Sequence, residues 1–177
     1  MAACTVDILL GDGRQALTLP PQAHVLRGPE IPRVEDPAVA VHDALRSPIG
    51  CQPLRALAAD RAPSSVCITM SDITRPVPNE LLITAILDEL NAVGVADAAC
   101  TLLIATGMHR PSTERERRIM LGEDLLARLR VVDHEADRLD MQVRVSDAPP
   151  VSVNRLYADA ELKIVTGLIE PHFMAGY

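Results

Sequence analysis

Aromatic residues, lysine and closely spaced cysteines are scarce in this sequence. It contains two tyrosines, one phenylalanine and no tryptophan, so nucleobases would find few aromatic rings on which to stack. Of its 17 basic residues one is a lysine, and the arginines are scattered through a chain of net charge −7. Because no basic stripe results, we expect no nucleic-acid partner. Arginines placed locally could still bind a small anion.

The cysteines do not form a recognisable framework. Cys4, Cys51, Cys67 and Cys100 include no C-x-x-C pair and no finger-like spacing with histidine, which argues against a structural zinc site. A domain of 177 residues can bury a sizeable core without disulfide bonds. We therefore expect all four cysteines to be small buried side chains.

Long apolar runs and several common catalytic motifs are also missing. No stretch reaches the ~18 apolar residues of a spanning helix, and the start lacks the basic segment of a signal peptide, which predicts a cytoplasmic protein without a membrane partner. G-x-G-x-x-G, the P-loop motif, H-E-x-x-H and a serine-centred elbow are absent. Ordinary dinucleotide, P-loop, zincin and serine-hydrolase interpretations therefore have no support.

The first part of the chain has its own pattern. Residues 3–19 alternate polar and apolar positions around a Gly-Asp-Gly turn, which predicts an antiparallel hairpin. Five prolines between positions 20 and 37 predict an extended connector. We therefore separate residues 1–35, a hairpin and connector, from an α/β core over residues 36–177.

In that core, helical and strand patterns alternate. The Asp-Pro pair at 36–37 and the capping box of Thr113 and Glu116 mark two helix starts. Apolar runs without alternation indicate strands buried on both faces. Strands are predicted over 64–70, 99–106, 130–133, 142–146 and 161–167, and helices over 38–47, 53–61, 78–93 and from 113 onward. This order predicts a mostly parallel, doubly wound (Rossmann-like) α/β sheet.

Three of the predicted strands end in loops rich in chemically active side chains. These loops read SDITRPVP (71–78), TGMHRP (106–111) and GLIEPHF (167–173). In an open parallel sheet the loops at the carboxyl ends of the strands gather at one edge, where ligands bind. The sequence therefore predicts that Asp72, Arg75, His109 and His172 converge.

Each of these residues also has a simpler interpretation. Asp72 and Thr74 could form an Asx turn, and Arg75 could lie on the surface. His109 could belong to an ordinary approach to a helix, and His172 to a turn. His24, His42 and His134 are given no role, because the first two lie where no chemistry converges and the third lies among charges of a solvated face. TERERR (113–118) is interpreted as a water-facing helix.

The three loops carry a family resemblance. SDITRPVP, ATGMHRPST and GLIEPHFMAGY resemble the motifs of the nickel-dependent lactate racemase family, and HDALRSPIG resembles its N-terminal region. The similarity covers most of the chain. It implies racemisation or epimerisation of a 2-hydroxy acid, such as lactate, with a nickel-pincer nucleotide (a Ni(II)-pyridinium-3,5-bisthiocarboxylate mononucleotide) as cofactor.

The resemblance also implies roles for individual residues. His109 and His172 would be the acid/base pair. Arg75 would meet either the substrate carboxylate or the cofactor phosphate, with help from amides at 72–75 that could cradle an anion. The residues implied to bind the cofactor are Asp72, Ile73, Thr74 and Arg75.

Two parts of the family's site would come from outside this sequence. In the family the last motif continues into S-G-G-R-K, whose lysine is tethered to the cofactor, and a later histidine ligates nickel. Both positions lie beyond residue 177, and Lys163 precedes the motif. We therefore expect the N-terminal catalytic domain of a two-domain racemase, inactive without its C-terminal domain. Met174, where the family often has an aromatic residue, leaves the substrate open.

The implied chemistry needs two bases. The α-hydrogen of a 2-hydroxy carboxylate is a poor acid, and it leaves more easily as hydride while a base takes the hydroxyl proton. Each enantiomer then needs its own base, and imidazole exchanges protons near neutral pH.

Two alternatives remain: a stand-alone nucleotide- or anion-binding module without turnover, and an enzyme acting on sugar phosphates without nickel.

Overall fold

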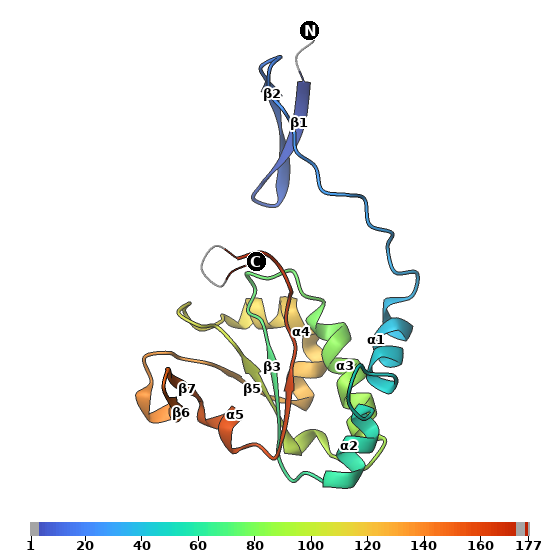
Figure 1. The fold of residues 1–177 in the computed structure, drawn as a ribbon, viewed down its shortest axis with the longest axis vertical. Coiled ribbons are helices and arrows are strands. Elements are labelled where there is room, and N and C mark those ends of the chain that lie inside the picture. Colours follow the sequence, from blue (N-terminus) through green and yellow to red (C-terminus); the bar gives the residue numbers. More distant parts are fainter. Residues whose placement is uncertain (1–3, 173–175, 177) are drawn as a thin grey trace. The chain divides into compact units, whose positions relative to one another are not determined.

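The computed structural model describes residues 4–172 and residue 176. The chain divides into two units, Met1–Val34 and Glu35–Tyr177 (Figure 1). In the first unit, β1 (Cys4–Leu10) pairs antiparallel with β2 (Gly13–Leu19), as predicted. The register sets Val6 opposite Leu17, so these two apolar side chains lie on the same face of the hairpin.

The second unit is built around a parallel sheet of four strands. These are β3 (Val66–Met70), β4 (Cys100–Ile104), β5 (Arg130–Asp133) and β8 (Leu162–Val165). Their order is β5-β4-β3-β8, and every neighbouring pair is parallel. The central strands β3 and β4 are buried on both faces, which explains why their sequences show no alternation. The prediction of a mostly parallel α/β sheet is confirmed.

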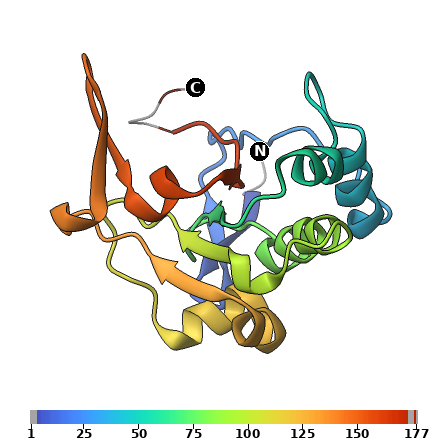
Figure 2. The same cartoon turned by 90° about the horizontal axis from the view of Figure 1, so that it is seen from below.

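Helices cover the two faces of this sheet unequally. On one side of the sheet lie α2 (Leu54–Arg61), α3 (Asn79–Asn91) and α4 (Glu114–Arg128), and α1 (Pro37–Arg46) packs on α3 and α2. The other face meets the short α5 (Arg155–Asp159), whose Tyr157 packs against a small cluster that contains Cys67 and Leu103. Figure 2 shows α3 and α4 on one side of the sheet and α5 on the other. None of the helices that the structure describes is long and apolar enough to cross a membrane.

Two helix starts formed as the sequence predicts. Asp36 accepts hydrogen bonds from the backbone N–H groups of Ala38 and Val39 at the start of α1, with proline at the first helical position. Thr113 and Glu116 form the complete capping box of α4. These local signals fix where the helices begin, and α4 in turn determines where the loop before it ends.

The segment between β5 and β8 was only partly predicted. The strand expected over 142–146 is β6 (Gln142–Asp147), but it lies outside the main sheet and pairs antiparallel with β7 (Pro150–Asn154). Neither β7 nor α5 was predicted. The Asn154 side chain caps α5 by accepting from the N–H of Leu156. The helix spans only five residues, which is too short for a helical period to stand out. Two short 3-10 turns, Asp97–Ala99 and Leu139–Met141, complete the unit.

The prediction that all four cysteines are buried is half wrong. Cys67 and Cys100 are buried in the sheet, whereas Cys4 and Cys51 are exposed, and all four are free thiols. Burial raises the pKa of Cys67 and of Cys100 to about 11. The two exposed cysteines lie in a hairpin strand and in a loop, where the neighbouring residues do not form a core that could bury a thiol.

This difference predicts selective labelling. At pH 8 a thiol reagent should modify Cys4 and Cys51 rapidly and leave Cys67 and Cys100 intact, because a thiol that is both buried and protonated is a poor nucleophile. Intact-mass spectrometry would show two added groups in native protein and four in denaturant. Rapid addition of four groups to native protein would contradict the described packing.

Candidate functional site

The candidate site lies where the parallel strands end. From β3 the chain passes through α3 to its neighbour β4, whereas β8 joins the opposite side of β3. The strand order therefore reverses between β3 and β8, and ligands of open α/β sheets usually bind at the carboxyl ends of the strands beside such a reversal. The loops that follow β3 and β8 leave at the same end of the sheet (Figure 1).

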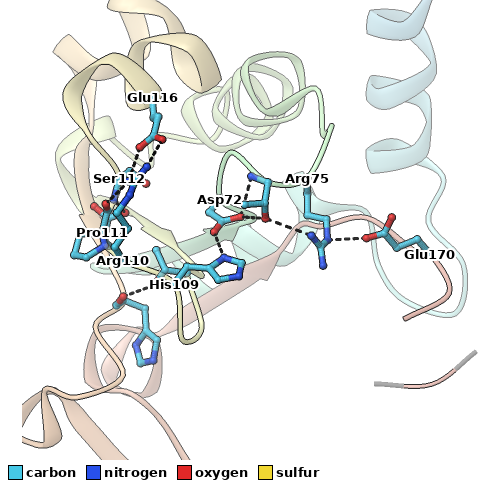
Figure 3. A network of polar contacts seen from close by, with 12 residues as sticks. Asp72, Arg75, His109, Arg110, Pro111, Ser112, Glu116 and Glu170 are labelled. Atoms are coloured by element: carbon cyan, nitrogen blue, oxygen red, sulfur yellow. Dashed lines mark hydrogen bonds and ion pairs between the residues drawn. The ribbon is translucent and has the colours of Figure 1, made fainter. Parts of the chain in front are cut away.

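Asp72 links the loop after β3 to the loop after β4. Its Oδ1 accepts from the backbone N–H of Thr74 at 3.1 Å and from the Thr74 hydroxyl, which confirms the Asx turn. Its Oδ2 lies 2.6 Å from Nδ1 of His109. Asp72 is 7% exposed, whereas the His109 side chain is 56% exposed. A buried carboxylate thus holds an accessible imidazole (Figure 3).

The protonation of this pair follows from its hydrogen bonds. Burial alone would raise the pKa of Asp72, but hydrogen bonds from Thr74 and His109 outweigh burial and lower it. Asp72 is therefore a carboxylate at neutral pH, and it accepts the proton carried by Nδ1 of His109. In the neutral imidazole, Nε2 is then the nitrogen with a lone pair available to accept a proton.

Arg75 links the loop after β3 to the loop after β8. Its Nε donates to Oε1 of Glu170 at 2.6 Å, and its Nη1 donates to the Thr74 hydroxyl oxygen at 3.3 Å. Together with the contact between Asp72 and His109, this ion pair brings all three sequence-predicted loops to one edge of the sheet. Thr74 joins the two contacts, because its hydroxyl also donates to Asp72.

His172 lies two residues after Glu170 in the third loop. Its backbone N–H donates to the carbonyl oxygen of Gly176 at 2.9 Å, and the N–H of Gly176 donates to the carbonyl oxygen of His172 at 2.8 Å. This loop belongs to the strand beside β3, whereas His109 follows the strand on the other side. Met174, at which the sequence departs from the family pattern, lies outside the described residues.

The segment around His109 is anchored by ionic contacts that the sequence did not reveal. Arg110 forms a forked contact with Glu116, at 2.9 and 2.7 Å. Asp133, at the end of β5, accepts from the N–H of Ser112 at 3.0 Å and from Arg117. The capping box made Glu116 recognisable as a helix start, but nothing in the sequence indicated that it also binds Arg110. These contacts fix the loop that carries His109.

The space in front of Asp72 and His109 is a small cavity. A cavity of about 270 Å³ is lined by Asp72, Ile73, Thr74, His109, Arg110, Ser112 and Glu116. The amides expected to cradle an anion are partly occupied, because the N–H of Thr74 donates to the Asp72 carboxylate and that of Arg75 to the Asp72 carbonyl. The arginine that lines this cavity is Arg110, whereas Arg75 lines a second cavity of about 670 Å³, and Ile73 belongs to both.

Two of the histidines set aside in the sequence have structural partners. His134 is half-buried, not on a solvated face, and its Nδ1 lies 3.1 Å from Nδ2 of Asn154. His42 contacts Glu89 on α3 through Nδ1 at 3.4 Å. His42 supports packing between α1 and α3, whereas the carbonyl oxygen of His134 accepts from the hydroxyl of Thr106 at the start of the loop after β4. Over residues 4–172 and 176, no group of three or more His, Cys, Asp or Glu side chains could hold a metal ion.

Comparisons with known proteins agree with this fold and these motifs. The chain is 35% identical over 140 residues to the lactate racemase of Thermoanaerobacterium thermosaccharolyticum and 36% identical over 140 residues to that of Lactiplantibacillus plantarum. Each alignment covers 77% of this chain and 32% of the relative. The chain thus spans about one third of the length of the curated relatives it matches.

Solved structures give the same result. The lactate racemase apoprotein of T. thermosaccharolyticum superposes with a TM-score of 0.76 and 29% identity, over 96% of this chain and 40% of that one. A protein from Thermotoga maritima, 19% identical with a TM-score of 0.53 over 72% of this chain and 32% of that one, shares the fold. Residues 10–177 match the lactate racemase N-terminal domain family, and the chain belongs to that family.

Proposed function

We propose that the full-length protein containing this chain is a racemase or epimerase of 2-hydroxy acids, of the lactate racemase type. The single observation that carries the proposal is the pairing of Asp72 with His109 beside Arg75 in adjoining loops. This arrangement offers a base and a carboxylate clamp at the position where an open α/β sheet binds ligands. Relatives named lactate racemase supply the reaction class.

Arg75 is proposed to bind the carboxylate of the substrate. Its planar guanidinium can form a forked pair of hydrogen bonds with two carboxylate oxygens, which fixes the orientation of the substrate as well as its position. The side chain is 33% exposed, so it can be reached from solvent. Lysine could supply the charge but not the fork, and we expect it to be a poor substitute.

His109 and His172 are proposed to be the two bases. Asp72 keeps the Nδ1 proton of His109 in place, so Nε2 can take the hydroxyl proton of one enantiomer. When His109 becomes an imidazolium, the Asp72 carboxylate stabilises the new charge. His172 is proposed to serve the other enantiomer from the opposite loop. When the planar 2-keto acid is reduced from its other face, the histidine that serves the enantiomer being formed donates a proton to the carbonyl oxygen, so both directions use the same two residues.

The described residues offer hydrogen-bonding groups to the cofactor that the resemblance implies, but no set of ligands for its metal. Asp72, Ile73 and Thr74, which line the cavity of about 270 Å³, and Arg75, which lines the second cavity, are the residues proposed to contact the nucleotide. Because the described residues provide no metal-ligand cluster, nickel ligands would come from elsewhere in the protein. When bound, a nickel-pincer nucleotide would supply the acceptor and donor of the α-hydride.

The domain organisation is part of the same proposal. Residues 1–35 are proposed to form a hairpin and connector, and residues 36–177 the α/β half of the catalytic unit. A second domain would complete the pocket with the tethering lysine and the nickel-ligating histidine. The chain's coverage of only 32% of its curated relatives supports this view. The alternative is a module that binds a nucleotide or anion without turnover.

The test is turnover by the full-length protein. Loaded with nickel-pincer nucleotide and offered pure D- or L-lactate, it should produce the other enantiomer from either side until the two are equal, as chiral chromatography would show. Other 2-hydroxy acids should be offered in parallel, because the described residues do not fix the substrate side chain. Binding of the cofactor without conversion of any hydroxy acid would instead support the binding module.

A further inference from the structure

Arg75 already has a counter-ion. Its Nε donates to Glu170 at 2.6 Å, and Figure 3 shows the glutamate on the side of the guanidinium away from Asp72. The two side chains are 33% and 40% exposed, so an anion in solution can reach the pair. Within the described part of the chain, Glu170 is the only carboxylate in ionic contact with Arg75.

The contact leaves part of the guanidinium available. Of its five N–H bonds, Glu170 takes the one on Nε and Thr74 takes one on Nη1. The other three, on Nη1 and Nη2, have no acceptor among residues 4–172 and 176. A carboxylate could therefore bind the outer edge of Arg75 while Glu170 stays in place.

We infer that Glu170 makes this site select anions that carry a single negative charge, a conclusion that rests on the proposed role of Arg75 as a carboxylate clamp. The pair of Arg75 and Glu170 has no net charge. A ligand on the outer edge lies close to both groups, and the glutamate repels it in proportion to the ligand's charge. The repulsion acts on one negative charge in a monocarboxylate and on two in a phosphate dianion, so its energy is about twice as large for the dianion.

This selection distinguishes the two anions that the sequence left open for Arg75. The charge of Glu170 disfavours a phosphate dianion at Arg75 more than it disfavours a 2-hydroxy monocarboxylate, which favours the substrate carboxylate as the partner of Arg75. Glu170 is thus a specificity-determining residue for the proposed reaction. Because it lies two residues before His172, it also holds the loop of that histidine to the loop of Arg75.

The test replaces Glu170 by glutamine, which keeps an oxygen that can accept from Nε but removes the charge. Lactate and inorganic phosphate are titrated separately into the 177-residue chain by calorimetry at pH 8 and low ionic strength, where phosphate is mainly a dianion. Glu170→Gln is expected to tighten lactate binding about threefold and phosphate binding about tenfold, roughly the square of the first factor.

A matched control is available on α4. There Nε of Arg118 contacts Oε1 of Glu123 at 2.9 Å, the same pair of atoms on an exposed helix surface. Glu123→Gln removes the same charge outside the three loops and should leave both affinities unchanged. The inference would be overturned if Glu170→Gln changed the affinities for lactate and for phosphate by the same factor, or changed neither. It would also be overturned if the variant failed to bind phosphate.

The result is independent of turnover. If the full-length protein does not racemise hydroxy acids but Glu170→Gln discriminates as expected, the proposed function fails and the charge selection at Arg75 stands. If the full-length protein racemises lactate but Glu170→Gln binds both anions as the wild type does, the proposed function stands and the inference about Glu170 fails.

Discussion

Replacing His109 by alanine in the full-length protein is expected to lower kcat for lactate racemisation about 10²- to 10⁴-fold, the usual contribution of a general acid/base. The imidazole is largely exposed and held by one buried carboxylate, so its loss removes a proton acceptor without opening the core. Far-UV circular dichroism should be unchanged. Stereospecific assays started from each enantiomer would give the rates.

Asp72→Asn separates a role in orientation from a role in folding. The amide oxygen should stay with the N–H of Thr74, which turns the NH₂ group toward His109. His109 must then accept at Nδ1 and carry its proton on Nε2, the wrong tautomer for a base. We expect a loss of activity similar to that of His109→Ala. His24→Ala, in the connector, should retain full activity. Undiminished racemisation by both site variants would contradict the acid/base assignment.

The largest expected effect on stability concerns Glu89, a carboxylate in α3 that is 1% exposed. Arg46 of α1 and Arg55 of α2 each contact it at 2.9 Å. Replacing both arginines by methionine leaves a buried charge with only His42 beside it, and should lower the free energy of unfolding by about 3–5 kcal/mol. Glu89→Gln should lower the free energy of unfolding by less, because both arginines are half exposed and can be hydrated by water when the carboxylate is gone. Urea denaturation gives both values.

The pH dependence of that network has a definite sign. Burial raises the pKa of Glu89, but hydrogen bonds from Arg46 and His42 outweigh it and lower the pKa overall. Its stabilising contribution is therefore complete above the unfolded-state value of ~4.3 and is lost as pH falls through the folded-state pKa. In the double methionine variant burial prevails and the pKa rises, so stability should increase as pH falls from 7.

The exposed pair of Arg118 and Glu123 is a control for this prediction. Both side chains face water, so Arg118→Met should change the free energy of unfolding by less than about 1 kcal/mol. If Glu89→Gln lowered the free energy of unfolding as much as the double arginine variant does, the prediction would be contradicted. Equal losses would mean that the buried carboxylate does not need its cations.

Much of the fold could be predicted because its signals are local. Asp36 and the Thr113 capping box start their helices, and the apolar runs of β3 and β4 indicate buried strands, whatever lies elsewhere in the chain. The hairpin β6–β7 and α5 were missed or misplaced, because a short strand in a side hairpin and a five-residue helix have no period that separates them from a loop.

The candidate site was predicted in part for a topological reason. Parallel strands bring the loops at their carboxyl ends together, so Asp72, Arg75 and His109 could be placed at one edge before any contact was known. Which atoms pair could not be predicted. Glu170 was part of a quoted motif, but its ion pair with Arg75 depends on the register of β8 against β3, which the sequence does not encode locally. The same holds for Glu116 and Arg110.

The central claim is that the three loops form one site, and nitrogen NMR of the imidazoles tests it most directly. Lactate titrated into the 177-residue chain labelled with ¹⁵N-histidine should shift the ring signals of both His109 and His172 and leave those of His24 and His42 in place. Arg75→Gln should abolish both shifts. A shift of one ring only, or shifts that persist without Arg75, would show that the loops do not act on a common ligand.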